Sequence, residues 1–197
     1  MESGLVCDLH TLEEYTIGTL YGAAECDGVV LLEVFRALTD GDSDRAKEAD
    51  AHLLSFKAGE EAREMTLRMG RRLLELIHSI CPTPLTEKFY KEAVEGTIAG
   101  CYPTAQALAG YALGIGERAL YAAHLYGVVN TILSAALRLM RLSHYDTQSI
   151  ISRLSPLCER LYESYGGVSI EEITSFVPTL ELATSLHERG KSRLFMN

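Results

Sequence analysis

The chain has 197 residues, of which 47% are hydrophobic and 23% charged, a composition typical of a soluble globular protein. Its formal net charge of −9 argues against a nucleic-acid surface, because phosphate contacts need clustered lysine and arginine side chains. The five cysteines are an odd number, none of them spaced as Cys-x-x-Cys, and the sequence shows no signal-peptide pattern. These features predict reduced thiols in a cytoplasmic protein.

The first half of the chain shows helical periodicity interrupted by turn residues. The pattern Thr11-x-x-Glu14 is a capping box that predicts the start of an early helix, and Asp27 begins a second that runs to about residue 38. An acidic turn at residues 40–44 precedes a third helix, which ends near Phe56. A long helix is predicted over residues 60–80. Its apolar stripe comprises Met65, Met69, Leu73, Leu76 and Ile80.

Proline and glycine residues punctuate the rest of the sequence. Cys81-Pro-Thr-Pro84 ends the long helix, because a residue that precedes proline is pushed out of the helical region. Gly166-Gly167 breaks the chain again, and Ser169-x-x-Glu172 is a second capping box. Further helices are predicted at residues 87–99, 104–113, 145–154, 156–165 and 178–188.

Residues 119–137 contain no charged side chain and are nominally long enough to span a bilayer. This segment also contains His124 and Asn130, together with several alanines suited to close helix packing. A helix that is apolar all round but carries such polar residues is expected in the middle of a soluble protein. We therefore predict an all-α fold, a single domain covering residues 1–197, with about ten helices around this central buried apolar helix.

Two motifs resemble metal sites. Asp40-x-Asp42-x-Asp44 resembles the start of a calcium loop, but Arg45 stands where glycine is required and Ala51 where a bidentate glutamate is required. The acidic residues are therefore interpreted as a solvated turn and helix N-terminal charges.

Glu75-x-x-His78 places a carboxylate and an imidazole on one helix face, as in di-iron bundles, although those sites need a second such pair. A helical metalloenzyme using Glu75 and His78 stays an alternative hypothesis.

Gly114-Ile-Gly116 has the spacing of a dinucleotide-binding turn, yet it follows a helix instead of a strand and so predicts a helix–helix connection. The residues alone predict a helical protein that is not an enzyme.

The C-terminal segment carries an unusual ending. Pro178 suits a first helical turn, Leu180 and Leu186 recur at helical spacing, and Gly190 ends the pattern. The last residues then mix cations with large apolar side chains. Two hypotheses stay open: a helix docked on the protein's own core, or a tail that binds another protein.

An ordered set of motifs gives the chain a family resemblance. They are Gly100-Cys-Tyr-Pro103, Leu113-Gly114-Ile115, residues 134–148, Leu154-Ser-Pro156, Pro178, Leu180-x-Leu182-Ala183, His187-Glu188 and Arg193-Leu194-Phe195. In this order and spacing the sequence resembles urease accessory protein F (UreF), over essentially the whole chain.

The resemblance implies an all-helical, non-catalytic homodimer that joins UreD (also called UreH) and the GTPase UreG and delivers nickel to the urease apoenzyme. It implies that nickel is handled by the complex and that this chain binds no cofactor tightly. It assigns UreD binding to a tail at residues 188–197 and to the five residues His187, Glu188, Arg193, Leu194 and Phe195. Arg138 matches a family arginine, either as an interface residue or as a partner for the last carbonyls of its helix.

Some features depart from the family pattern. The glycine-rich leader segment of the family is expected to be missing, and Cys101, Ala107 and Ser143-His144 replace usual family residues. A generic helical protein-interaction module unrelated to nickel is the main alternative function.

Overall fold

The computed structural model describes residues 6–57 and 59–173, and within these ranges the chain forms eight α-helices and no strand. The α-helices are α1 (Leu9–Gly22), α2 (Gly28–Asp40), α3 (Ser43–Phe56), α4 (Glu60–Ile80), α5 (Pro84–Glu95), α6 (Tyr102–Ala112), α7 (Glu117–Leu139) and α8 (His144–Tyr165). A π-helical turn, η1 (Ala23–Asp27), joins α1 to α2, and a 3₁₀ turn, η2 (Ile170–Glu172), follows α8. The all-α prediction is confirmed. The helix predicted at residues 178–188 lies outside the described residues.

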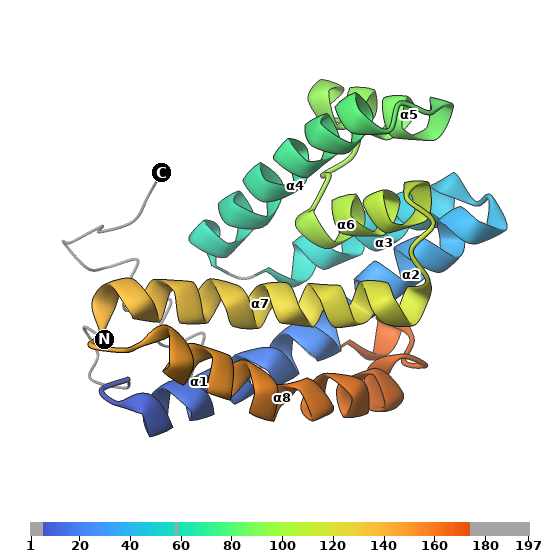
Figure 1. Ribbon diagram of the computed structural model, residues 1–197. Coiled ribbons are helices and arrows are strands. Elements are labelled where there is room, and N and C mark those ends of the chain that lie inside the picture. Colours follow the sequence, from blue (N-terminus) through green and yellow to red (C-terminus); the bar gives the residue numbers. More distant parts are fainter. Residues whose placement is uncertain (1–5, 58, 174–197) are drawn as a thin grey trace.

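Helix α7 organises the molecule. It packs against α1 and α8 on one side and against α2 and α6 on the other. Helix α6 in turn packs against α2 and α4, and α4 carries α5. As a result α6 lies between α4 and α7, which diverge from each other toward the end where α4 ends and α7 begins (Figure 1).

The apolar segment predicted at residues 119–137 forms most of α7. By length and composition alone this helix could cross a membrane. However, Tyr121, His124 and Leu125 are buried among the other helices, and the first two have polar partners there. A helix with these contacts is typical of the core of a soluble protein, as the sequence predicted.

The start of α1 differs from its prediction. Asp8 is the N-cap: its carboxylate accepts the backbone N–H of Thr11 at 2.8 Å, and the Thr11 hydroxyl accepts the backbone N–H of Asp8 at 3.1 Å. The interpretation of Thr11 as the first residue of a capping box is therefore wrong. Thr11 closes a box that begins three residues earlier. The second predicted box is confirmed, since Ser169 and Glu172 cap η2 reciprocally.

The two helices predicted around Pro156 are a single helix, α8. A proline inside a helix removes one hydrogen bond and costs about 3 kcal/mol. Leu154 and Leu157, on either side of it, are both buried in the core. Their burial offsets the cost of the proline and keeps the helix continuous.

Candidate interaction surface

The apolar stripe of α4 faces solvent. Its side chains are among the most exposed large apolar groups of the described protein, with exposed fractions of 54% for Met65, 41% for Met69, 52% for Leu76 and 62% for Ile80. The buried face of α4 is instead made of Thr66, Gly70, Leu74 and Ile77. The stripe predicted from the sequence is real, but most of it is not the face that holds α4 to the core.

A glycine explains which face of α4 is buried. A Cβ atom at Gly70 would lie 1.9 Å from the carbonyl oxygen of Gly100, so only glycine lets the backbone before α6 cross the helix there. The hydroxyl of Thr66 accepts the backbone N–H of Tyr102 at 3.2 Å, one turn away. Small residues thus bring α6 onto this face.

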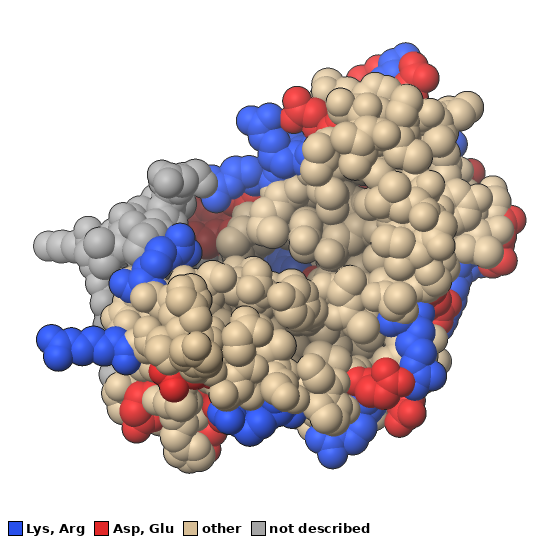
Figure 2. Space-filling model, in the orientation of Figure 1, with Lys and Arg blue, Asp and Glu red and all other residues tan. Residues whose placement is uncertain are grey.

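The exposed residues of α6 continue the surface. Tyr102 and Ala109 are half-buried, and Leu113, just past the end of α6, is exposed, because the opposite side of α6 is buried against α2. On α7 two small residues leave open space: Ala123 is exposed, and a Cβ at the half-buried Gly127 would meet nothing within 4 Å. Figure 2 shows this largely uncharged face and its hollow between α4 and α7.

The N-terminus of α6 is fixed by a buried carboxylate from α3. Asp50 is 1% exposed and accepts the backbone N–H groups of Gly100 at 2.7 Å and Cys101 at 2.8 Å. It also accepts the hydroxyl of Thr104 at 2.7 Å. The carboxylate therefore supplies the cap that no side chain at Cys101 provides, and it complements the positive end of the helix dipole.

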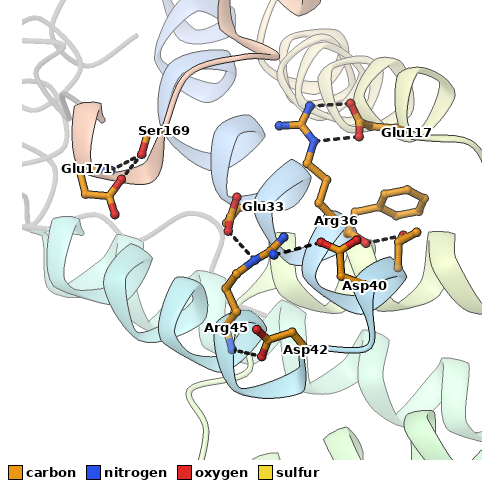
Figure 3. A network of polar contacts seen from close by, with 10 residues as sticks. Glu33, Arg36, Asp40, Asp42, Arg45, Glu117, Ser169 and Glu171 are labelled. Carbon is orange, nitrogen blue, oxygen red and sulfur yellow. Dashed lines mark hydrogen bonds and ion pairs between the residues drawn. The ribbon is translucent and has the colours of Figure 1, made fainter.

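A second polar cluster fixes the start of α7 (Figure 3). Arg36 of α2 forms a bidentate pair with Glu117, with nitrogen–oxygen distances of 2.9 and 2.6 Å, and also donates to the carbonyl oxygen of Gly166 at 2.6 Å. The Tyr162 hydroxyl donates to Glu117 at 2.8 Å. The hydrogen bond from Arg36 lowers the pKa of Glu117, and that from Tyr162 adds to the effect against the cost of partial burial. This cluster ties α2, α7 and α8 together.

The acidic residues at 40–44 form a turn with charges at a helix N-terminus, as interpreted from the sequence. Asp42 caps α3 by accepting the backbone N–H of Arg45 at 3.0 Å. The Arg45 side chain reaches Asp40 at 3.0 Å and Glu33 at 2.9 Å (Figure 3). Asp40 and Asp42 thus serve an ion pair and a helix cap.

Two further polar pairs lie near the junction of α6, α7 and η1. The Nδ1 atom of His124 lies 2.7 Å from the Gln106 side-chain oxygen, and its buried Nε2 atom has no hydrogen-bond partner among the described residues. Burial lowers the pKa of His124. The Lys57 ammonium lies 2.7 and 3.0 Å from the two carboxylate oxygens of Asp27. The Asp27 charge favours the protonated form of His124 and the Lys57 charge opposes it, so the two pairs are linked electrostatically.

The structure does not place Glu75 and His78 in a metal site. Glu75 pairs with Arg72 at 2.8 Å on the surface of α4, and the ring of His78 stacks on Tyr90. Among the described residues no three His, Cys, Asp or Glu side chains are grouped so as to hold a metal ion. Burial raises the pKa of Cys26 to about 11, so this thiol stays protonated at neutral pH, a poor state for a metal ligand.

The predicted partner-binding residues fall in two places. His187, Glu188, Arg193, Leu194 and Phe195 lie outside the described residues. Arg138 lies in the last turn of α7 and is exposed, where its charge complements the negative end of the helix dipole. The residues that the sequence did not reveal are Arg36, Asp50, Glu117 and Gly70, since their partners are distant in the chain.

Comparison with known proteins decides the family. The UreF family model matches residues 6–155. The chain belongs to the UreF family. It is 36% identical, over all 197 of its residues and 86% of each relative, to the urease accessory proteins UreF of Yersinia enterocolitica (serotype O:8 / biotype 1B) and Yersinia pseudotuberculosis (serotype IB). The same identity and coverage hold for the urease accessory protein UreF of Yersinia pestis (strain Pestoides F).

Membership of the UreF family confirms three predictions from the sequence: the family itself, an accessory role in urease maturation, and the absence of a catalytic function. The helical architecture of the described residues suits such a role. An exposed apolar face on such a protein marks a candidate interaction site, so the stripe of α4 becomes the main feature of interest.

Proposed function

We propose that the protein is a scaffold of the urease maturation complex, which joins UreD (UreH) and UreG on the urease apoenzyme so that nickel reaches the active site. The observation that carries this proposal is the 36% identity to urease accessory proteins UreF along the whole chain. We further propose that the protein acts as a homodimer in the cytoplasm.

We propose that nickel is handled by the assembled complex and is not held in a dedicated site on this chain. Nickel prefers imidazole and thiolate ligands, and thiolates must be deprotonated to bind. Burial and the neighbouring Asp50 raise the pKa of Cys101, and burial also raises that of Cys26. Both thiols are therefore protonated at neutral pH, which supports transfer through partner subunits.

We also propose that residues 188–197, with His187, Glu188, Arg193, Leu194 and Phe195, contact UreD. Support comes from the sequence, because a tail that mixes cations and large apolar side chains offers both anchoring and charge pairing to a partner. Arg138 is proposed as an additional interface residue, since its exposed position at the end of α7 leaves its side chain within reach of a partner.

Co-purification with the cognate UreD and UreG tests the scaffold, and urease activity with the nickel content of urease tests its outcome. We expect deletion of the gene to give apo-urease that regains activity when the gene is restored. Normal nickel content without the gene would overturn the proposal. For the tail, Leu194→Asp with Phe195→Asp should abolish UreD capture, whereas Val94→Asp with Tyr145→Asp, at exposed positions of α5 and α8, should leave it intact. Undiminished UreD capture by the tail variant would show that this assignment is wrong.

A further inference from the structure

The uncharged face between α4 and α7 has the form of a groove. Met65, Met69 and Leu76 each precede a buried residue of α4, so the stripe lies along the edge of the α4–α6 contact. Helix α6 forms the floor, because it contacts α4 at Thr66 and α7 at His124. Figure 2 shows the hollow between α4 and α7.

The spacing of the exposed side chains fits a helix laid in the groove. The stripe recurs every three or four residues over about four turns of α4, which is the pattern by which one helix packs along another. The opposite wall offers Ala123 and Gly127, small residues that leave room for the side chains of an incoming helix. Methionine side chains adapt to different apolar surfaces, so Met65 and Met69 suit a face that meets a partner.

The charges at one end of the groove define the partner further. Arg68 near the start of α4, Arg138 in the last turn of α7 and Arg141 just after it are exposed at the end of the groove where α4 begins and α7 ends. Within residues 6–57 and 59–173, Arg68 and Arg141 have no ionic partner. Lys and Arg side chains lie at this end in Figure 2, with some Asp and Glu side chains beside them, on a chain whose net charge is −9. Local cations on an acidic protein select acidic groups on a partner.

A second copy of the chain fits this groove less well. In an antiparallel pairing centred on the stripe, the midpoint falls between Arg72 and Leu73, so the Arg72–Glu75 ion pairs of the two copies would meet at the symmetry axis. Removing these charges from water costs free energy and opposes association. A partner with acidic residues has no such conflict.

We infer that the groove between α4 and α7 binds an amphipathic helix of another protein, with its apolar stripe on Met65, Met69 and Leu76 and its acidic residues beside Arg68 and Arg141. This goes beyond the scaffold role proposed above, and it uses a surface separate from residues 188–197. The partner is defined by chemistry: apolar side chains at three- and four-residue spacing, with carboxylates concentrated at one end.

Two designed helical peptides test the inference against the full-length protein. They share one leucine stripe and differ only at one end, where the first carries glutamates and the second lysines. We expect the acidic peptide to bind at least about tenfold more tightly than the basic one, and this preference to weaken in high salt. Binding of neither peptide, or equal binding of both, would overturn the inference.

Matched variants locate the site. Met69→Asp should weaken binding of the acidic peptide by about tenfold or more, whereas Val94→Asp, at a 68% exposed position of α5, should leave it unchanged. Arg68→Glu with Arg141→Glu should reverse the preference to the basic peptide. Arg160→Glu with Lys88→Glu is the control. It changes the net charge by the same amount at other exposed positions and should leave the preference for the acidic peptide in place. Unchanged binding by the groove variants, with their helical content intact, would place the peptide elsewhere.

Two other occupants give distinct results. If the groove held a second copy, the protein would form a dimer that Met69→Asp dissociates and Val94→Asp does not, as measured by sedimentation. If it held the chain's own C-terminal segment, a photo-crosslinker at position 69 would react within one chain, with residues 174–197. Either result contradicts binding of a separate partner helix.

Discussion

The hydroxyl of Tyr121 donates a hydrogen bond of 3.0 Å to the carbonyl oxygen of Ala24, inside the π-helical turn that joins α1 to α2. A π-turn interrupts the regular pattern of helix hydrogen bonds, so a carbonyl within it can accept from elsewhere. The Tyr121 ring also packs against Gly28, where a Cβ would lie 2.6 Å from a ring carbon. The tyrosine therefore holds the π-turn against α7.

Tyr121→Phe tests this contact. The variant keeps the ring but leaves the buried Ala24 carbonyl without its donor, so we expect the free energy of unfolding to fall by about 1–2 kcal/mol. Urea denaturation followed by circular dichroism measures the change. Tyr126→Phe, at a 52% exposed position of the same helix, is the control and should change stability by less than about 0.5 kcal/mol. Equal stability of the two variants would mean that the buried bond contributes nothing.

Gly70→Ala tests the crossing of α4 by the chain before α6. Because the new methyl group would overlap the Gly100 carbonyl, the two segments must separate, and overpacking of this kind typically costs about 1–3 kcal/mol. The melting temperature should fall by about 2–4 °C for each kcal/mol lost. Gly18→Ala in α1, where a Cβ meets nothing within 4 Å, should instead keep or raise stability. A stable Gly70→Ala protein would show that the crossing is looser than described.

The sequence predicted elements with local causes and missed those with distant ones. Helix α4 was predicted with its observed bounds, because Gly59 and Cys81-Pro82 mark its ends in the sequence itself. Its buried face was not predictable, because it depends on Gly100, thirty residues further along the chain from Gly70. The apolar stripe therefore indicated a helix correctly but not which side of it faces the core.

The same limit applies to the polar contacts. Asp50 and Gly100, and Arg36 and Glu117, are joined across 50 and 81 positions of sequence, and no local motif marks them. The family and its role were predictable, because an ordered set of short motifs in the sequence resembles that family, and the comparisons confirm the resemblance. The groove was not predictable, since it exists only where three helices meet.

Glu117→Gln tests the cluster at the start of α7 through its pH dependence. The pKa of Glu117 is lowered from 4.5 in the folded protein, so its ionised form stabilises the fold above that pH, and the stabilisation is lost as the pH falls through the folded pKa. At pH 7 the variant should be about 1–2 kcal/mol less stable than the parent, because a hydrogen-bonded charge pair is lost. At low pH, where Glu117 is protonated, the difference in the free energy of unfolding between the variant and the parent should shrink.

Urea titrations of both proteins at several pH values measure this convergence. Glu48→Gln, at an exposed position of α3, is the control and should change stability by less than about 0.5 kcal/mol at pH 7. A constant difference between the Glu117→Gln variant and the parent at all pH values would show that the carboxylate charge is not what stabilises the cluster.

His124 should make stability depend on pH in a higher range. Burial lowers its pKa from 6.5, so the unfolded chain binds a proton more readily than the folded protein does. The free energy of unfolding should therefore fall as the pH drops below 6.5, by at most about 1.4 kcal/mol per pH unit for one proton, and be independent of this group above that pH. His124→Asn should remove this slope whatever its effect on stability at neutral pH, whereas His144→Asn, at an exposed position, should retain it. The slope of the free energy of unfolding between pH 5 and 6.5 could instead be the same in the parent, His124→Asn and His144→Asn. That result would show that another group causes the pH dependence and that protonation of His124 does not limit stability in mild acid.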